Sequence, residues 1–375
     1  MKIGIITQPL QTNYGGLLQN FALQKILARL GHQAITLDQP QIRCTRTRIY
    51  LSSIKKMLLY ILGKGKLDKM PHYITDKELN YVAQKIVPFI EKHITRTARL
   101  NSKSSFRQII KEHRLDAIIV GSDQVWRPMY NPVITRTYLD FAQGLDIKRV
   151  SYAASFGVDN WEYTAKQTKD CSRLAKLFNA ISVREISAIN LCKEHLGVKA
   201  EFVLDPTLLL DKEDYIKTIE EETQSPGNMF TYILDDSVEK RAIIKDIAKK
   251  LQLFPFTTMP PKDISHITEA PDKCVFPSVT QWLRSFVDAK FVVCDSFHGA
   301  VFSIIFNKPF IIIANQDRGV ARFDSLLRTF NLKDRLIYSI DQTDIAYNNI
   351  DWETVNNTKI EIQKKSLDFL VNSLK

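Results

Sequence analysis

Long apolar runs, paired cysteines and a secretory signal are all missing from this sequence of 375 residues. No apolar run approaches the ~20 residues that a membrane-spanning helix needs. The opening MKIGIITQP has no apolar core or cleavage site of a signal peptide and predicts a buried strand instead. The five cysteines are scattered and form no CxxC pair, which argues against a zinc site or a disulfide framework. These absences predict a protein of the reducing cytoplasm.

Signals for redox cofactors and for nucleic acid are also absent. The segment Thr12–Gly16 lacks the G-x-G-x-x-G spacing of dinucleotide-binding folds, so we expect no nicotinamide or flavin cofactor. We find no nucleic-acid recognition motif, no internal repeat and no low-complexity segment. The composition, with 45% hydrophobic and 25% charged residues, is that of an ordinary globular protein.

Positive charge is concentrated in one segment. Residues 41–115 contain 17 Lys and Arg against 5 Asp and Glu, a balance of +12, whereas the whole chain carries +11. Within this segment, residues 51–66 combine apolar side chains with Lys55, Lys56, Lys64 and Lys66. Such a stretch suits the surface of an anionic membrane, where each basic residue adds ~1 kcal/mol. A solvated helix that packs on its own domain is the alternative.

Short apolar segments alternate with helical patterns along most of the chain, which predicts an α/β fold with parallel sheets. The length exceeds that of one ordinary core, so we expect two Rossmann-like domains, residues 1–208 and 209–375, with a cleft between them. Strands are expected at residues 2–8, 34–38, 116–120, 150–154, 180–183, 202–204, 229–234, 253–257, 291–294 and 310–314. Helices are expected at residues 17–30, 238–251, 279–286, 300–306, 323–330 and 352–374.

The most informative turn is Asp295–Gly299, between an expected strand and an expected helix. Ligands of open α/β sheets bind at the carboxyl ends of strands, and a helix amino terminus there favours an anion. A histidine at such a place, His298, is a candidate proton donor near neutral pH. A capped helix with a structural histidine remains an alternative.

Six motifs, spread over residues 3–330, resemble those of the polysaccharide pyruvyl transferase family. They are Asn13–Asn20, Gly121–Trp126, Ser151–Gly157, Ser182–Glu185, Asp205–Thr207 and the stretch from Asp295 to Phe310. The resemblance implies a pair of Rossmann-type domains of the glycosyltransferase-B kind. It also implies phosphoenolpyruvate as the donor, a sugar diol as the acceptor and a pyruvate ketal as the product. Such a reaction needs anion-binding groups and a proton donor, but no metal and no other cofactor.

On the donor side the resemblance makes His298 the general acid and Arg184 a clamp for the donor anion. Ser296 and the N–H groups from Gly299 onward would bind phosphate at the helix start. Arg322 and, with less support, Lys308 are further candidate anion binders. The chain departs from many family members at Ser296, where they have an arginine, and we expect Arg322 to replace it. Three structural alternatives stay open: a surface pair of Arg184 with Glu185, a helix cap at Ser296 and an ordinary loop at Lys308.

On the acceptor side, Asp123 would orient a hydroxyl group or act as a base. Trp126 would offer a face to a sugar ring, although a tryptophan in this position is also typical of a core. Asn13, Tyr14 and Gln19 are placed to hydrogen-bond a sugar across the cleft.

The leading functional hypothesis is a cytoplasmic pyruvyl transferase of surface polysaccharide biosynthesis. It would act on a sugar or a lipid-linked oligosaccharide, with peripheral contact to the inner face of the membrane. One alternative is a nucleotide-sugar glycosyltransferase on the same scaffold, since a fold does not fix a function. The other is a non-catalytic scaffold of polysaccharide assembly, which the missing arginine at Ser296 keeps open.

Overall fold

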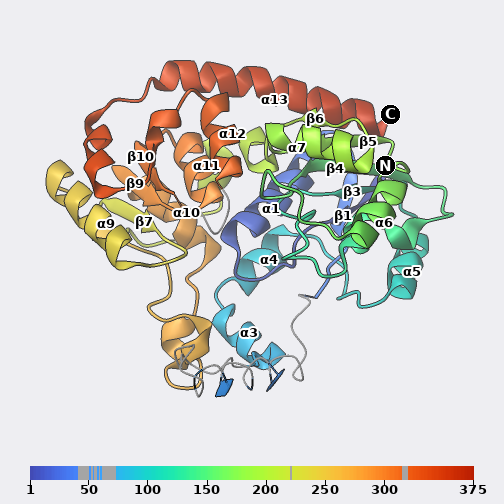
Figure 1. The fold of residues 1–375 in the computed structure, drawn as a ribbon, viewed down its shortest axis with the longest axis horizontal. Coiled ribbons are helices and arrows are strands. Elements are labelled where there is room, and N and C mark those ends of the chain that lie inside the picture. Colours follow the sequence, from blue (N-terminus) through green and yellow to red (C-terminus); the bar gives the residue numbers. More distant parts are fainter. Residues whose placement is uncertain are drawn as a thin grey trace.

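The computed structural model describes residues 1–40, 50, 51, 54, 57, 58, 60, 73–219, 222–314 and 320–375. Two parallel sheets lie in two domains beside each other (Figure 1). The first sheet has the strand order β2-β1-β3-β4-β5-β6 and the second has the order β11-β10-β9-β7-β8. All neighbouring strands run parallel, so the predicted α/β class with two parallel sheets is confirmed.

The strands are short and mostly buried. They are β1 (Lys2–Ile6), β2 (Gln33–Thr36), β3 (Ala117–Val120), β4 (Lys148–Ala154), β5 (Ala180–Val183), β6 (Glu201–Phe202), β7 (Met229–Tyr232), β8 (Pro255–Phe256), β9 (Phe291–Cys294), β10 (Phe310–Ile313) and β11 (Leu336–Ile337). Strands β3 and β9 are buried at every position because helices cover both faces of each sheet. Pro255 begins an edge strand, where its missing N–H removes no hydrogen bond from the sheet interior.

Helices surround both sheets. The α-helices are α1 (Tyr14–Arg29), α3 (Asp76–Val82), α4 (Val87–His93), α5 (Lys103–His113), α6 (Ala165–Ala175), α7 (Ile186–Leu191), α8 (Lys212–Ile216), α9 (Val238–Leu251), α10 (Val279–Asp288), α11 (Phe297–Ile305), α12 (Ala321–Thr329) and α13 (Trp352–Leu374). Shorter helical turns are η1 (Ile134–Tyr138), η2 (Asp140–Ala142), η3 (Cys192–Leu196), η4 (Pro206–Leu209), η5 (Ile264–His266), η6 (Pro271–Cys274), η7 (Lys333–Arg335) and η8 (Ile340–Tyr347). Within the described residues, no helix is long and apolar enough to span a bilayer.

Two helices begin three residues earlier than predicted, and both differences shape the site. Helix α1 starts at Tyr14 because Asn13 caps it, accepting a hydrogen bond from the Gly16 N–H at 3.1 Å. The glycine pair expected in a turn therefore lies inside the first turn of a helix. Helix α11 starts at Phe297 rather than at residue 300, which brings His298 into its first turn.

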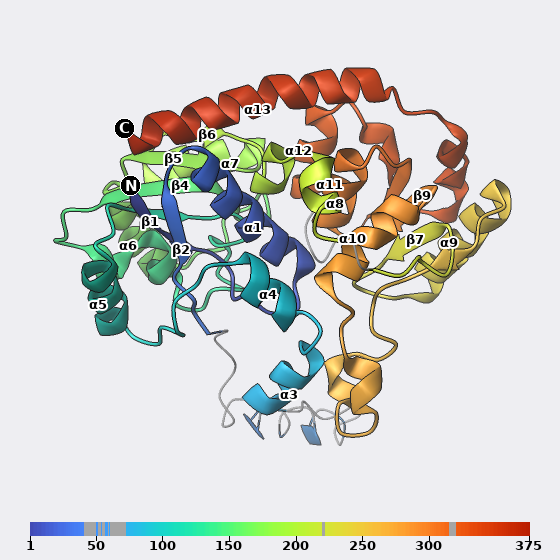
Figure 2. The same ribbon diagram turned by 180° about the vertical axis from the view of Figure 1, so that it is seen from behind.

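The last helix connects the two domains. Helix α13 runs along one side of the molecule and spans both domains, as the two opposite views show (Figures 1 and 2). Its Ser366 hydroxyl accepts a hydrogen bond from the Leu204 N–H at 3.0 Å, and its Phe369 ring lies 6.3 Å from that of Tyr152 in β4. The expected division after residue 208 falls between the two sheets, but α13, which follows it, packs back onto the first domain.

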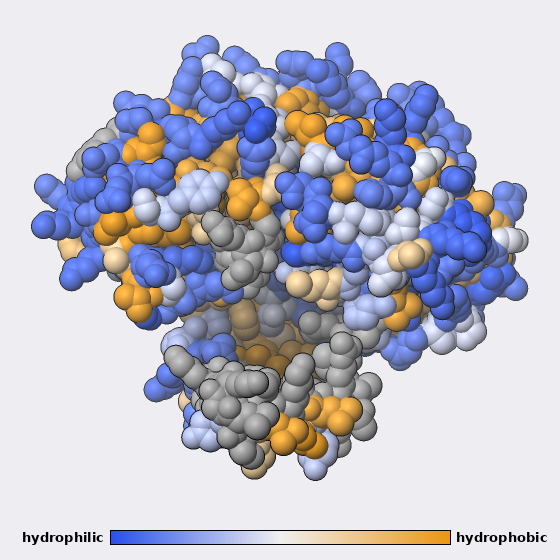
Figure 3. All heavy atoms as spheres, viewed as in Figure 1, coloured by the Kyte–Doolittle hydropathy of each residue, from blue (hydrophilic) through white to orange (hydrophobic). Residues whose placement is uncertain are grey.

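A small side lobe, made of α3 and residues 260–276, lies below the two domains in Figure 1. Val82, Ile267 and Cys274 form its core, and the Phe276 N–H donates to the Val82 carbonyl at 2.9 Å. The lobe therefore joins a segment of the first domain to a segment of the second. Figure 3 shows a hollow between this lobe and the body of the molecule, with apolar residues at its floor. Residues Lys55, Lys56, Lys64 and Lys66 lie outside the described residues.

Candidate active site

Charged and hydroxyl side chains follow four neighbouring strands of the first sheet. Asp123 comes after β3, Ser155 after β4, Arg184 and Glu185 after β5, and Asp205 after β6. Each of them is buried. Because the strands are parallel, their carboxyl ends meet at one edge of the sheet, where ligands of such folds bind.

Arg184 connects three carboxylates at this edge. Its Nη1 lies 2.7 Å from Oδ2 of Asp205, its Nη2 lies 3.4 Å from Oδ1 of Asp123, and its Nε lies 3.5 Å from Oε1 of Glu185. Burial alone would lower the pKa of the guanidinium, but the three carboxylates outweigh burial and raise it above the ordinary value. Arg184 is therefore a permanent buried cation, and its pairing with Glu185, left open above as a surface pair, belongs to an interior network.

Asp205 is the most firmly held of the carboxylates. Its Oδ1 accepts hydrogen bonds from the N–H and hydroxyl of Thr207, at 3.0 and 2.7 Å, and its Oδ2 accepts one from Ser122 at 3.1 Å. Burial would raise the pKa of Asp205, but its interactions with His298 and Arg184 hold the pKa far below the ordinary value. Asp205 is thus an ionised anchor and not a proton donor.

His298 reaches this edge from the second domain, in the first turn of α11. Its Nε2 lies 3.7 Å from Oδ2 of Asp205, which is an ion-pair distance but too long for a hydrogen bond. Although the ring is buried, Nε2 has no hydrogen-bond partner among the described residues. The other face of the ring packs against α1, where a Cβ added to Gly15 would lie 2.0 Å from Nδ1. The amino ends of α1 and α11 therefore meet at this imidazole.

A second buried arginine shares an aromatic ring with the first. The Phe297 ring lies 4.2 Å from Cζ of Arg184 and 5.9 Å from Cζ of Arg322. Burial and the positive charge of Arg184 lower the pKa of Arg322 to about 10, although Asp123 and Glu185 act in the opposite direction. Two guanidinium groups buried this close together create a site that favours an anion.

Asp123 borders the cluster on the side of Asn13. Its Oδ2 accepts a hydrogen bond from Nδ2 of Asn13 at 3.0 Å, and Asn13 itself is exposed. Burial would raise the pKa of Asp123, but the positive charges of Arg184, His298 and Arg322 hold it below the ordinary value. A buried but ionised carboxylate can accept a proton, as a base for a hydroxyl group requires.

Glu185 behaves in the opposite way. Its Oε1 accepts a hydrogen bond from the Ser155 hydroxyl, while its Oε2 is buried without a partner among the described residues. Burial raises the pKa of Glu185 above the ordinary value, and the attraction of Arg184 only partly offsets that effect. Environments that push the pKa values of neighbouring carboxyl groups apart are typical of sites that transfer protons.

The remaining donor-side predictions lie in different places. Ser296 is the N-cap residue of α11, but its side chain makes no capping hydrogen bond. Gly299 allows α11 to approach β9, since an added Cβ would lie 2.8 Å from Cβ of Cys294. Lys308 does not join the cluster. Its Nζ donates to the Val287 carbonyl at 2.8 Å, and the residue precedes β10, which places it at the amino edge of the sheet.

Trp126 does not offer a face to a sugar. It is fully buried, stacks on Tyr138 with 4.9 Å between ring centroids, and donates its indole N–H to the Thr137 carbonyl at 3.2 Å. The structure therefore supports the alternative in which Trp126 is a core residue and does not stack on a sugar ring. Rings in such a core stabilise the fold through packing and cannot reach a ligand in the cleft.

Gln19 and Tyr14 also have structural partners. The amide of Gln19 is buried and bonded at both ends, to the Thr7 hydroxyl at 2.6 Å and to the Ser122 N–H at 2.8 Å. Tyr14 is buried between the domains, where its hydroxyl donates to the Pro277 carbonyl at 2.8 Å. Of the three expected acceptor contacts on this segment, only Asn13 is exposed.

The prediction did not give site roles to Asp205, Glu185, Phe297 and Gly15. Asp205 and Glu185 each follow a strand of the first sheet, which is the same signal that pointed to Asp123. Phe297 and Gly15 act through contacts between the two domains, and no local pattern in the sequence reports such contacts.

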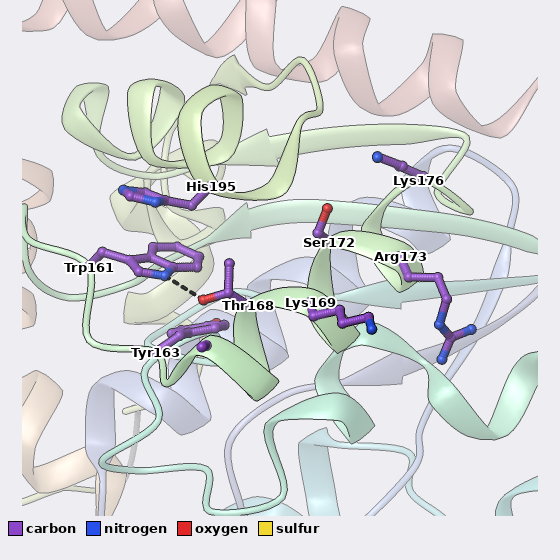
Figure 4. A pocket seen from close by; sticks show the side chains of 9 residues that line it. Trp161, Tyr163, Thr168, Lys169, Ser172, Arg173, Lys176 and His195 are labelled. Carbon is purple, nitrogen blue, oxygen red and sulfur yellow. Dashed lines mark hydrogen bonds between the residues drawn. The ribbon is translucent and has the colours of Figure 1, made fainter.

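A surface pocket of about 760 Å³ lies away from this cluster, beside α6 and η3. Figure 4 shows His195 and Tyr163 on opposite sides of the Trp161 indole, with ring centroids 4.4 and 4.2 Å away. Both faces of the indole are therefore covered, and the neighbouring basic side chains do not converge on one point. In the described part of the chain, no group of three or more His, Cys, Asp or Glu side chains could hold a metal ion.

A comparison of the chain with models of protein families tests the resemblance that the motifs indicated. The model of the family described as polysaccharide pyruvyl transferase matches residues 13–317. The chain belongs to the polysaccharide pyruvyl transferase family. This is a family of enzymes. The matched region contains every motif noted above and the residues of the buried cluster except Arg322, which lies just beyond it. A comparison with curated protein sequences found no match.

Solved structures show which fold this pyruvyl transferase family member has. UDP-N-acetylglucosamine 2-epimerase from Rickettsia bellii is 11% identical with a TM-score of 0.50, covering 100% of this chain and 96% of its own. UDP-GlcNAc 2-epimerase from Methanocaldococcus jannaschii, solved with UDP-GlcNAc and UDP, is 12% identical with a TM-score of 0.51. The comparison covers 97% of the present chain and 100% of the epimerase chain. At this level of identity the likeness concerns the fold alone, and it confirms the expected glycosyltransferase-B architecture.

Proposed function

We propose that this protein transfers the pyruvyl group of phosphoenolpyruvate to two hydroxyl groups of a sugar, forming a pyruvate ketal on a unit of a surface polysaccharide. The observation that carries the proposal is the pair of buried guanidinium groups, Arg184 and Arg322, whose Cζ atoms lie 4.2 and 5.9 Å from the Phe297 ring, next to His298. A small donor with about three negative charges fits a site of this kind. Family membership supplies the pyruvyl group as the part that is transferred.

The reaction balances with the groups present. The enol carbon C3 of the donor takes a proton, which makes C2 electrophilic, and the first sugar hydroxyl forms a bond to C2. The bond from C2 to the phosphate oxygen then breaks, and the second hydroxyl closes the ketal. Of the two hydroxyl protons that are given up, one is balanced by the new methyl group and the other by the released phosphate.

Proton donation, proton acceptance and phosphate binding are assigned to different residues. His298 is the proton donor to C3, because its Nε2 is buried and not engaged in a hydrogen bond among the described residues. Asp123, which remains ionised, accepts the proton of the attacking hydroxyl, while Asn13 orients that hydroxyl from the exposed side. The first-turn N–H groups of α11 add their partial positive charge to the phosphate site.

The serine at position 296 is compatible with this role. Family members often have an arginine there, and the present chain compensates for its loss with Arg322. Arg322 is at the start of α12 but lies 5.9 Å from the ring of Phe297, the residue next to Ser296. Arg322 thus brings a positive charge from a different element to the aromatic ring that follows Ser296 in the chain.

Calorimetric binding of phosphoenolpyruvate tests this proposal without knowledge of the acceptor. Wild type should bind phosphoenolpyruvate, and Arg322→Ala should weaken binding by about tenfold or more, since a charge-assisted contact contributes about 1.5–3 kcal/mol. Arg184→Ala should abolish binding, but it also leaves buried carboxylates unpaired and needs circular dichroism to verify folding. Arg241→Ala, a surface residue paired with Asp236, is the matched control and should bind as wild type does.

The same titrations with UDP and GDP separate the alternatives. Binding of a nucleoside diphosphate in place of phosphoenolpyruvate would favour a nucleotide-sugar glycosyltransferase. Binding of neither compound would leave the scaffold alternative in the stronger position.

We further propose that the protein works in the cytoplasm and contacts the anionic inner face of the membrane, where lipid-linked acceptors are accessible. Tyr50, Leu51, Ile54, Met57, Leu58 and Tyr60 are helical and 39–69% exposed. Their spacing places most of them on one face of a helix, which is the pattern of an interfacial helix. The excess of positive charge in residues 41–115 gives the same region an affinity for anionic lipid.

A further inference from the structure

The segment that follows Trp126 carries exposed aromatic and apolar side chains next to the buried cluster. Met129 and Tyr130 are 65% and 41% exposed, whereas Trp126 beside them is fully buried. Asn131 fixes the segment, since its buried amide donates to the carbonyls of Gln124 and Val125 at 3.0 Å each. The exposed side chains therefore project from a rigid turn.

The Tyr130 ring packs on the buried guanidinium group of Arg127. Cζ of Arg127 lies 5.4 Å from the centre of the Tyr130 ring. Arg127 is itself held by a bidentate pair with Glu162, with both N–O distances at 3.2 Å, and is only 3% exposed. The covered side of the ring is thus fixed by a cation, and its exposed part faces solvent.

This ring lies close to the residue that follows Asp123, because Asn131, next to Tyr130, donates to the Gln124 carbonyl at 3.0 Å. Tyr130 is close enough to Arg322 to contribute to the electrostatics of that guanidinium. The segment follows Asp123 closely in the chain, and Asp123 is the residue proposed to accept the hydroxyl proton. The side chains of the charged cluster are buried, so a sugar must approach the cluster from an exposed side.

We infer that Tyr130, with Met129 beside it, forms the platform on which the pyranose ring of the acceptor packs. One face of a pyranose is made of C–H groups, and it is stabilised by packing on an exposed aromatic face whose hydroxyl edge remains polar. The platform assigns to Tyr130 the role that the sequence suggested for Trp126. This inference rests on the proposed function, because it is the acceptor of that reaction that the platform would bind.

Saturation-transfer difference NMR tests the platform with methyl pyranosides, namely the α and β methyl glycosides of glucose, galactose and mannose. The measurement is made with phosphoenolpyruvate present in excess. At least one glycoside should receive saturation on its ring C–H protons. Tyr130→Ala should weaken its binding by about threefold to tenfold, and Tyr130→Phe should restore most of it because the ring remains. Tyr338→Ala, which removes a tyrosine 56% exposed in the second domain, is the matched control.

Three results would overturn the platform: no transfer to any glycoside, unchanged transfer in Tyr130→Ala, or a loss of phosphoenolpyruvate affinity in Tyr130→Ala as large as that in Arg322→Ala. The third result would place Tyr130 in the donor site. If wild type failed to bind phosphoenolpyruvate but still bound a glycoside through Tyr130, the proposed function would fail while the platform stood.

Discussion

Neighbouring carboxyl groups in the cluster respond to burial in different ways, and the difference depends on which cations each one meets. Asp205 and Asp123 face positive groups closely enough for their pKa values to fall despite burial. Glu185 has one oxygen without a partner among the described residues, and burial raises its pKa. The folded protein thus holds a proton on Glu185 more tightly than the unfolded chain does.

Replacement of Glu185 by glutamine should therefore change how stability depends on pH. A raised pKa contributes stability that is fully present below the unfolded pKa and is lost as the pH rises through the folded pKa. Wild type should lose stability as the pH increases from about 4.5 upward, relative to Glu185→Gln, which has no proton to lose. Urea denaturation across this pH range measures the difference in the free energy of unfolding.

Glu213→Gln, at an exposed position, is the control and should follow the wild-type curve. A difference between wild type and Glu185→Gln that stayed constant with pH would mean that Glu185 ionises normally in the fold. In that case Glu185 would not retain a proton that it could donate within the site.

The sequence located most of the charged residues of the cluster but not their partners. Asp123 and Arg184 follow expected strands, and this position alone places them at the carboxyl edge of a parallel sheet. Lys308 precedes a strand, and the same rule applied to it would have placed it at the amino edge, where the structure has it. Trp126 shows the limit of the rule, because the position of a residue after a strand does not say whether its side chain faces the cleft or the core.

At the scale of elements, the site depends on two helix amino termini that meet at the His298 ring, with a glycine on the side of α1. Gly15 in the first turn of α1 leaves room for the His298 ring in the first turn of α11. The partial positive charges at the amino termini of α1 and α11 both act on the space around the His298 imidazole. A larger residue at position 15 would separate the ends and displace the imidazole.

Gly15→Ala should impair the site more than the fold. An added Cβ would meet Nδ1 and Cγ of His298 at 2.0 and 2.1 Å, so the ring must move, and we expect phosphoenolpyruvate affinity to fall about tenfold. Alanine favours a helix over glycine by about 1 kcal/mol, which offsets part of the cost of the clash in stability. Calorimetry and thermal unfolding of the same samples give both quantities.

Gly144→Ala is the matched control for this change. Gly144 has φ of +75° and no heavy atom within 4 Å of an added Cβ, so the change should cost stability through backbone strain alone and leave the affinity unchanged. Wild-type affinity in Gly15→Ala would show that His298 does not need its present position to bind the donor.

The strands could be predicted at this scale, whereas the first turns of the helices could not. Continuous apolar runs such as Phe291–Cys294 read directly as buried strands. The start of α1 was missed because a glycine pair is typical of a turn, and only the cap formed by Asn13 overrides that preference. Helix α3, which was not predicted, begins at a capping box formed by Thr75 and Glu78.

At the scale of the whole molecule, the two domains are joined by contacts between segments far apart in the sequence. Tyr14 of the first domain stacks on Trp282 of the second with 5.5 Å between ring centroids. Helix α13 crosses both domains, and the side lobe takes one segment from each. A two-domain α/β fold followed from the alternation of strands and helices, but these contacts depend on residue pairs that no local pattern connects.

The membrane contact proposed above concerns the end of the molecule at which the side lobe lies. The exposed apolar residues belong to the segment that precedes α3; they are Tyr50, Leu51, Ile54, Met57, Leu58 and Tyr60. Helical fragments of this part of the chain lie at the outer end of the lobe, away from α13 (Figure 1). Contact through this end would leave both domains and the hollow above the lobe open to an acceptor held at the bilayer surface.

Vesicle co-sedimentation measures this contact. Wild type should bind vesicles that contain anionic lipid more strongly than zwitterionic ones, and binding should weaken as salt rises from about 50 to about 500 mM, because screening shortens the range of the lysine charges. Leu51→Ser combined with Met57→Ser keeps every charge but removes apolar surface, and it should lower the partition coefficient by about tenfold. Charge reversal at Lys55, Lys56, Lys64 and Lys66 should weaken binding to anionic vesicles only.

Phe254→Ser and Ile360→Ser remove apolar side chains that are 72% and 61% exposed on other elements, and neither should change vesicle binding. If the double serine variant bound as wild type does, and salt had no effect, the lobe would have no role at the membrane. If salt weakened binding but the serine variant did not, the contact would be electrostatic alone, and the exposed apolar face would need another partner. If added salt and the double serine variant each abolished vesicle binding while phosphoenolpyruvate affinity was retained, membrane contact would be separate from donor binding. The two activities would then depend on different ends of the same domain.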